Sequence, residues 1–400
     1  MDHTTDSTIV QKSDNHHASD FIINNQSISA EKLSTRLAFF IAGFGLSCWA
    51  PLVPFAQIRM QAEPAMLGVI LLCLGLGAVI GMPIAGGLSG KMGSKKVIIT
   101  GALGLAVSLP LLAILATPLE IGLTLFIFGA SLGAIDVAAN IHGTEVQKKA
   151  GVPLMSGFHG FYSIGGLAGA SVTTLLIASG LGPLTAIAIA SVIIIVCLAK
   201  AWNGFLNSPY GEKYPLFVLP KGKVVLIGML AMIIFLAEGA MLDWGALLLI
   251  QTKNLDANIA GSGYVIFAIA MTISRFAGDQ MVEKFGERVI LYSGFILTGI
   301  GILLTASLPS ITGVFIAMAV IGFAAGNIVP ILFTLAGKQK SMPAPLAISA
   351  ASILAYFGIL MGPALIGFVA YFTGLAIAFI ALGGLVIFST LLITYVTPQK

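Results

Sequence analysis

The stretch GGLSGKMGSKK, residues 86–96, decides the fold because it recurs in the second half of the chain as GDQMVEKFGER, residues 278–288. Lysines and glycines match at one constant spacing (284 − 91 = 193), and the matches continue into the following apolar segments. The matched pairs are Lys91 with Lys284, Gly93 with Gly286, Gly101 with Gly294, Gly129 with Gly322, and Gly133 with Gly326. A register kept over three successive segments indicates an internal duplication.

The composition indicates an integral membrane protein. Of the 400 residues, 58% are apolar and 9% are charged, whereas soluble domains carry roughly 25% charged residues. The three cysteines, Cys48, Cys73 and Cys197, all lie within apolar runs, so we interpret them as packing residues rather than as a disulfide framework or a metal site. The net charge of +4 comes mostly from basic residues between apolar segments, which membrane topology explains better than nucleic-acid binding.

Apolar segments of about 20 residues recur along the chain, and each is long enough to cross ~30 Å of hydrocarbon as a helix. We count twelve, at residues 37–57, 65–88, 97–116, 119–141, 153–179, 183–202, 223–250, 258–282, 289–308, 311–336, 344–371 and 374–396. The sequence therefore predicts an all-α membrane protein with twelve transmembrane helices in two pseudo-symmetric six-helix bundles.

The longest connection follows the sixth segment and sets the domain boundaries. Residues 1–34 are polar, without a signal-peptide pattern, and we expect a disordered tail on the cytoplasmic side. The first bundle is expected at 35–202, a cytoplasmic linker at 203–222, and the second bundle at 223–400.

The distribution of basic residues predicts the orientation. If the N-terminus is cytoplasmic, all but three of the 20 Lys and Arg lie in the tails, the cytoplasmic loops or the adjoining helix ends. Arg59 and Lys253 lie on the far side, and Arg275 lies within a helix. The positive-inside rule then predicts that both termini are cytoplasmic. We expect the protein in the inner or plasma membrane of the cell.

The loop at residues 86–96 resembles the signature of the major facilitator superfamily, Gly-x-Leu-(Ala/Ser)-Asp-Arg-x-Gly-(Arg/Lys)-(Arg/Lys). Gly86, Lys91 and Gly93 stand in matching places, but the acidic position is Gly90. The second loop keeps the acid and base as Glu283 and Lys284, before Gly286. The resemblance implies the major facilitator fold and a conformational latch at these loops. The alternative is that they are ordinary positively charged loops, which would leave the repeated glycines unexplained.

Two further stretches, GAIDVAANIHGTEV and PLMSGFHGFYSIGGLAGA, together with AEGAMLDWGALLL, resemble the branch of this superfamily that includes YbjJ and MosC. For the solute, this resemblance implies a small polar molecule of sugar or polyol type. In this superfamily the first, fourth, seventh and tenth helices line the central cavity. On that basis Trp49 of the first segment and Asn327 of the tenth are candidate cavity residues, and Tyr356 of the eleventh segment is a further candidate.

The seventh apolar segment contains two carboxylates, in LAEGAMLDWGALLL at residues 236–249. Glu238 is expected near the bilayer midplane, where a lone carboxylate costs roughly 2.5–3.5 kcal/mol. We interpret it as the leading proton-coupling residue, which takes up and releases a proton as water access alternates; the alternative is a structural hydrogen bond. Asp243 lies about 140° further around the helix, so it is a weaker candidate and equally a gate or interface residue.

The fourth and fifth segments contain a second polar set. Asp136 and Asn140 are spaced i and i+4 and share one helix face, and His159 is expected at a similar depth. We therefore expect Asp136 to be the second proton-coupling candidate, with Asn140 and His159 in the cavity. The alternative is a polar clamp between helices.

Arg275 and Asp279 also have i and i+4 spacing, close to Glu283. We interpret this same-helix pair as part of the latch rather than of the solute site.

The sequence predicts no enzyme, no cofactor and no metal site. GASLG at 129–133 and GLSG at 87–90 match hydrolase strings, but neither has a base beside it, and small residues at helix contacts explain both. We expect a monomeric secondary active transporter in the lipid bilayer that moves a small polar solute by alternating access, most simply in symport with protons. The alternatives are an exporter of the same fold and a solute sensor or assembly protein that transports nothing.

Overall fold

The computed structural model describes the backbone of residues 6–62, 64–206, 218–255 and 262–397, and these ranges contain helices and no strand. The first half comprises α1 (Asp6–Trp49), η1 (Ala50–Leu52), α2 (Val53–Met60), α3 (Pro64–Met92), α4 (Ser94–Ile114), α5 (Pro118–Ala150), α6 (Met155–Ala178), α7 (Pro183–Ala201) and η2 (Trp202–Gly204). The second half comprises α8 (Lys223–Lys253), α10 (Ser262–Phe285), α11 (Glu287–Ser307), α12 (Ile311–Ala325), α13 (Ile328–Lys338), α14 (Ala344–Thr373), α15 (Leu375–Phe388), η3 (Ser389–Leu392) and α16 (Ile393–Val396).

Within these ranges, twelve helical spans are long and apolar enough to cross a membrane, which confirms the expected number. The first of them is described over Ile28–Leu52, and Ile28 is the first residue whose side chain the structure describes. The helix to which it belongs starts at Asp6, so its backbone takes in most of the polar segment that we expected to be disordered. The side chains of residues 1–27 lie outside the described part of the chain, and the prediction for the tail stays open.

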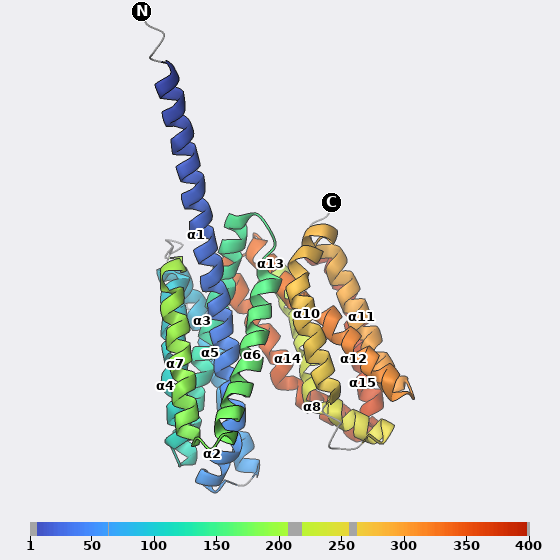
Figure 1. Cartoon of the computed structure of the whole chain (residues 1–400). Helices are drawn as coiled ribbons and strands as arrows, with labels where there is room; N and C mark the ends of the chain where they lie inside the picture. Colours follow the sequence, from blue (N-terminus) through green and yellow to red (C-terminus); the bar gives the residue numbers. More distant parts are fainter. Residues whose placement is uncertain (1–5, 63, 207–217, 256–261, 398–400) are drawn as a thin grey trace, which may run out of the picture.

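The helices form two bundles, α1–α7 and α8–α16, that lie side by side (Figure 1). Helix α3 contacts α14 and helix α6 contacts α10, and these two pairs join the bundles. At the offset of 193 residues, α10 is the counterpart of α3 and α14 is the counterpart of α6. The interface between the bundles is therefore built from two equivalent helix pairs, as a duplicated chain predicts.

Glycines at equivalent positions make the same close contacts in both bundles. A Cβ at Gly129 would collide with the carbonyl of Leu74, and a Cβ at Gly322 would collide with the carbonyl of Phe267. Both contacted residues are also 193 apart (267 − 74), so the glycine register reflects equivalent helix crossings. Small residues allow such backbone approach in membranes, and this contact also explains why GASLG begins with a glycine.

The glycines of the two signature loops have the same backbone conformation. Gly93 precedes α4 with φ 87°, and Gly286 precedes α11 with φ 81°. A side chain is unfavourable at positive φ, so both turns require glycine.

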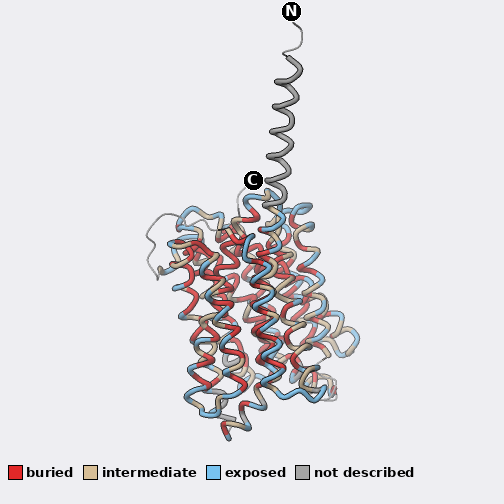
Figure 2. Tube along the Cα trace, turned by 60° about the vertical axis from the view of Figure 1, so that its left-hand side comes forward, coloured by how far each residue is buried: buried red, intermediate tan, exposed pale blue. Residues whose placement is uncertain are grey.

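The buried residues lie where helices of a bundle contact one another, and not in a single central core like that of a soluble domain. Buried residues lie along the helix faces that meet one another, while exposed positions alternate along the outside (Figure 2). Many of these exposed side chains are large and apolar, for example Leu167, Ile316 and Phe388. A lipid-facing surface accounts for such exposure.

Candidate functional site

The tenth span is broken in its middle, and the break forms one wall of the candidate site. Helix α12 ends at Ala325 and α13 starts at Ile328, with Gly326 and Asn327 between them. Asn327 is 1% exposed, and its Nδ2 donates to Ser274 O at 2.9 Å and to Ser274 Oγ at 2.8 Å. The predicted cavity residue Asn327 thus fastens the break to α10.

Pro330 explains why the helix breaks here. A proline has no N–H, so the carbonyl four residues earlier, that of Gly326, loses its helical donor. Arg275 of α10 supplies a substitute, because its Nε donates to Gly326 O at 3.4 Å. The counterpart of Pro330 in the first bundle is Val137 (330 − 193), and α5 is continuous there. The break is therefore a feature of the second bundle alone.

Arg275 also connects the two bundles. Its Nη1 donates to the Oγ of Ser163, on α6, at 2.6 Å. The residue is 8% exposed, so this charge is almost fully enclosed. We expected Arg275 to pair with Asp279 on its own helix, but the described residues show no ion pair between them, because each finds partners across the interface.

Glu238 is an acidic residue that interacts electrostatically with Arg275. This residue lies on α8, is partly buried, and has one carboxylate oxygen, Oε1, that is buried without a hydrogen-bond partner among the described residues. Arg275 is close enough to interact electrostatically with it. An unpartnered buried carboxylate oxygen is costly, so the position predicted from sequence as the most unusual acid is also a strained one in the structure. Asp243, one and a half turns further along α8, is exposed.

The first bundle contributes a chain of hydrogen bonds on α5 and α6. Asn140 Nδ2 donates to Asp136 O at 2.8 Å and lies 3.5 Å from Asp136 Oδ1, while Asn140 Oδ1 faces His159 Nε2 at 3.1 Å. All three side chains are buried. We expected His159 to contact Asp136 directly, but Asn140 lies between them. With Asn140 Oδ1 as the acceptor, this contact is a hydrogen bond in the His159 tautomer that carries its proton on Nε2.

Two tyrosines accompany the two polar sets. Tyr162 of α6 is near enough to Asp136, Arg275 and Glu238 to interact electrostatically with all three. Sequence reasoning missed it, although Tyr162 follows His159 by three residues and so shares its helix face. Tyr356 of α14 is half-buried.

Two further aromatic contacts describe the predicted cavity residues. Tyr356 lies edge-on to Phe235, with ring centroids 5.9 Å apart. Trp49 is buried at the end of α1, immediately before the turn that contains Pro51. Among the described residues Trp49 has no hydrogen-bond partner, so its place in the cavity stays a prediction.

Asp279 joins the bundles on the side of the termini. Its Oδ1 accepts from the Ser156 backbone N–H at 3.0 Å, and its Oδ2 accepts from the Gly157 N–H at 2.8 Å. Ser156 and Gly157 belong to the first turn of α6, whose N–H groups have no partners within the helix. A carboxylate at a helix N-terminus is also favoured by the helix dipole.

At the equivalent helix pair of the interface, α3 with α14, the position that corresponds to Asp279 carries no charge. Gly86 is the counterpart of Asp279, and Ser349 is the counterpart of Ser156, at the same offset of 193. A Cβ at Gly86 would collide with the side chain of Ser349, whose Oγ donates to Met82 O at 2.9 Å. One interface pair is thus held by close packing and the other by a charge.

The other latch residues predicted from the loop signature lie at the surface. Lys91, Glu283 and Lys284 are exposed, and in the described part of the chain none of them forms an ion pair. A role for them in switching therefore remains a prediction.

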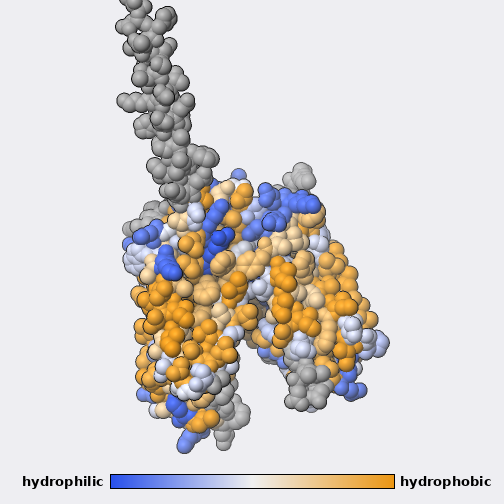
Figure 3. All heavy atoms as spheres, viewed as in Figure 1, coloured by the Kyte–Doolittle hydropathy of each residue, from blue (hydrophilic) through white to orange (hydrophobic). Residues whose placement is uncertain are grey.

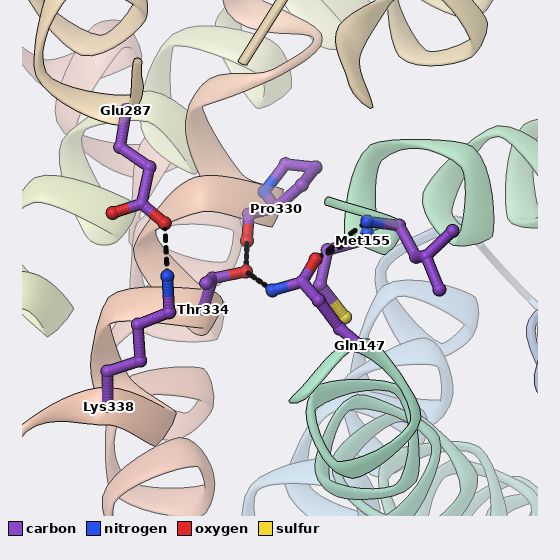
Figure 4. A network of polar contacts seen from close by, with 7 residues as sticks. Gln147, Met155, Glu287, Pro330, Thr334 and Lys338 are labelled. Atoms are coloured by element: carbon purple, nitrogen blue, oxygen red, sulfur yellow. Dashed lines mark hydrogen bonds and ion pairs between the residues drawn. The ribbon is translucent and has the colours of Figure 1, made fainter. Parts of the chain in front are cut away.

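A second bridge between the bundles joins α5 to α13 (Figure 4), and its residues line the same cavity as Asp279. Gln147 of α5 donates from Nε2 to Thr334 Oγ1 of α13 at 3.2 Å. Its Oε1 accepts from the N–H groups of Leu154 and Met155 at 2.7 and 3.1 Å. Gln147 therefore ties the loop before α6 to the opposite bundle, and no sequence motif marked it.

Twelve spans in two duplicated bundles, with buried polar sets facing the interface between them, define a membrane transporter with two repeats. The chain matches the Major Facilitator Superfamily over residues 36–341. It is 46% identical to an uncharacterized MFS-type transporter of Yersinia pestis over 352 residues, which cover 88% of this chain and 91% of the relative. It is 29% identical to the membrane protein MosC of Rhizobium meliloti over 359 residues, 87% of this chain and 86% of MosC.

Solved structures agree on the fold. The Escherichia coli fucose:proton symporter FucP matches with TM-score 0.73 and 18% identity, over 93% of this chain and 100% of that one. FucP in its outward conformation matches with TM-score 0.76 over the same shares of the two chains. The chain belongs to the major facilitator superfamily. It is an integral membrane protein that transports a small solute, and it is not an enzyme.

Proposed function

We propose that the protein is a monomeric secondary active transporter that moves a small polar solute in symport with protons by alternating access. The observation that carries the proposal is the pair Glu238 and Arg275. A partly buried carboxylate, one of whose oxygens has no hydrogen-bond partner among the described residues, interacts there with an arginine that also connects the bundles at Ser163. Because one chain contains both bundles, one chain contains the whole pathway. Residues 35–202 and 223–400 are the two moving units, and 203–222 connects them.

The structure suits the outward-facing half of such a cycle. The two bundles part on the face opposite the N-terminus, where a deep notch separates them, and they meet on the face of the termini (Figure 3). The contacts of Asp279 and Gln147 are on the closed side, with those of Arg275 between them and the site. If the termini are cytoplasmic, the notch opens toward the outside of the cell.

The two basic residues of the far side support this orientation. Arg59 donates to Leu115 O at 3.1 Å and to Leu112 O at 2.6 Å, and Lys253 donates to Ala306 O at 3.2 Å. Both cations thus cap the C-terminal end of a helix, α4 or α11, which the helix dipole favours. Their presence outside the cytoplasm therefore has a structural reason and does not count against the positive-inside rule.

Reporter fusions test the orientation. A reporter at Leu206 in the linker should be active only in the cytoplasm, and one at Asn254, after α8, only outside it. The reverse pattern would overturn the topology and with it the outward-facing assignment.

For the solute we propose a sugar- or polyol-like molecule. The facing polar sets carry both hydrogen-bond donors and acceptors, namely Asn140, His159 and Arg275, and the half-buried rings of Tyr162 and Tyr356 border them. Hydroxyl groups donate and accept, and sugar rings pack on aromatic faces, so this mixture suits them. FucP, which shares the fold, carries fucose with protons, and this supports the class rather than the particular solute.

Glu238→Gln tests the proton coupling. Glutamine keeps the shape and the hydrogen bonds of the side chain but cannot cycle between charged and neutral forms. We expect the variant to lose solute accumulation driven by a pH gradient and to keep exchange of labelled for unlabelled solute. Glu120→Gln is a matched control, because it also changes one glutamate and its capping box with Thr117 tolerates glutamine.

The outcomes also separate the alternatives. Wild-type accumulation by Glu238→Gln would remove this residue from the coupling and leave Asp136 as the next candidate. Loss of both accumulation and exchange would make Glu238 structural. A wild-type protein that binds a solute but never exchanges it would be a sensor. A wild-type protein that moves the solute only in the direction opposite to the proton flow would be an exporter.

A further inference from the structure

A cavity lies between the bundles on the closed side, and Glu238 is not among the residues that line it. Its volume is about 520 Å³, within the range of small-molecule sites. Thr144, Gln147 and Lys148 of α5 line it from the first bundle, and Thr334 and Lys338 of α13 line it from the second. Asp279 and Glu287 complete its charged wall.

Most polar groups of this wall are already satisfied. Lys338 pairs with Glu287 at 2.7 Å, and Asp279 is held by the two N–H groups of α6 (Figure 4 shows the former pair). Thr334 Oγ1 both donates to Pro330 O and accepts from Gln147. The wall therefore has few groups that still need a partner.

Lys148 is the exception among the charged groups. It is exposed, and within the described ranges it has neither an ion pair nor a hydrogen bond. Gln147 adds a second donor, because only one of the two Nε2 hydrogens is used in its bond to Thr334. Lys148 and Gln147 thus offer two donors that still lack a partner among the described residues, one of them cationic, and these two groups suit an anionic acceptor.

We propose that this cavity is a binding site for a small organic oxyanion, a carboxylate or a phosphate monoester, anchored by Lys148 and the free N–H of Gln147. The site exists only while the bundles meet on the side of the termini, because both bundles form its wall. When the bundles part there, the Gln147–Thr334 bond breaks and Lys148 moves away from α13. A ligand that binds one state alone shifts the equilibrium toward that state, so the oxyanion holds the transporter in the conformation that is closed at the termini.

Thiol protection tests this site without measuring transport. The native Cys48, Cys73 and Cys197 are replaced by alanine, and Thr144→Cys places one reporter in the cavity wall. The full-length protein is then labelled with a neutral maleimide in the presence of sodium succinate, sodium phosphate, or sodium chloride at matched ionic strength. Succinate represents carboxylates, and inorganic phosphate represents phosphate monoesters.

We expect succinate or phosphate to slow labelling about fivefold in a saturable way, a size typical of one charge pair in water, while chloride has little effect. Protection by one anion alone identifies which of the two groups the site prefers. Lys148→Gln should abolish the protection and Lys148→Arg should keep it. Lys96→Gln is the matched control, since Lys96 is an exposed lysine of the same bundle that does not line the cavity.

Three results would overturn the proposal: protection by chloride equal to that by the two anions, no saturable protection by either anion, or full protection in Lys148→Gln. Labelling of Lys96→Cys in the same background shows whether the reagent is active, and the thermal unfolding temperature of each variant shows whether it is folded. Since transport is never measured, failure of this site leaves the assignment of Glu238 untouched.

Discussion

Arg275 of the second bundle donates a hydrogen bond to Ser163 of the first, with 2.6 Å between Nη1 and Oγ. The same guanidinium satisfies the carbonyl of Gly326 that Pro330 leaves without a donor. One side chain therefore holds the broken tenth span, the partner bundle and the neighbourhood of Glu238 together. Under the proposed proton coupling, a change in the charge of Glu238 would alter its electrostatic interaction with Arg275, and this would connect proton binding to the contact between the bundles.

Arg275→Lys should disrupt all of these contacts at once. Lysine keeps the charge but has no planar fork, so it cannot reach Gly326 and Ser163 together. Each lost hydrogen bond to a charged group is worth about 1.5–3 kcal/mol. We expect a lower thermal unfolding temperature in detergent and at least a roughly tenfold loss of transport, equivalent to about 1.4 kcal/mol.

The exposed Arg288, which stacks on Tyr292 of its own helix, provides the control for this prediction. Arg288→Lys should leave both measurements near their wild-type values. Equal effects of the two substitutions would mean that Arg275 is an ordinary basic residue and not the connection described above.

Asp279→Asn should weaken closure on the side of the termini. Asparagine offers one acceptor oxygen instead of two and removes the charge at the N-terminus of α6, an effect worth about 0.3–2 kcal/mol. Spin labels at Lys200→Cys and Lys340→Cys, one on each bundle, report the separation of that face. We expect the long-distance population to rise by a factor of about 2 to 30.

Glu283→Gln is the comparison that the loop signature demands, because Glu283 occupies its acidic position. The Asp279 contacts predict a much smaller change of the same distance distribution for Glu283→Gln. If Glu283→Gln changed the distance distribution more than Asp279→Asn did, the conformational latch would lie in the signature loop and not at Asp279.

The architecture was predictable from the sequence because both of its signals are local or periodic. Apolar runs of bilayer length give the twelve spans, and the glycine spacing of 193 gives the duplication. Gly129 and Gly322 show why the second signal is reliable: each contacts a carbonyl of a neighbouring helix, so neither tolerates a side chain. The start of α1 was less predictable, because the helix extends from the apolar segment back to Asp6 through residues that are polar in the sequence.

The partners of the polar residues were not predictable from spacing. Arg275 and Asp279 are one turn apart and suggested a pair, yet Asp279 binds backbone N–H groups 122 and 123 residues away. Backbone donors leave no trace in a sequence. Gln147 was missed for a similar reason, because its importance comes from Thr334, 187 residues further along the chain. Tyr162 was within reach of sequence reasoning through its helix face shared with His159.

The break in the tenth span leads to the last prediction, Pro330→Val. Valine is the residue at the equivalent position of the unbroken fourth span, Val137, so the protein itself shows that it fits such a helix. The new N–H can bond the carbonyl of Gly326, which then no longer needs Arg275. The straightened helix should keep or raise the thermal unfolding temperature, because a proline within a helix costs about 3 kcal/mol. Transport should nevertheless fall about tenfold or more, since Arg275 loses the contact that positions it between Glu238 and Ser163.

Pro110→Val, at a proline within α4 and outside the site, is the control and should affect transport little. A Pro330→Val variant with wild-type transport would show that the break is a packing detail, and Arg275 would then act through Ser163 alone.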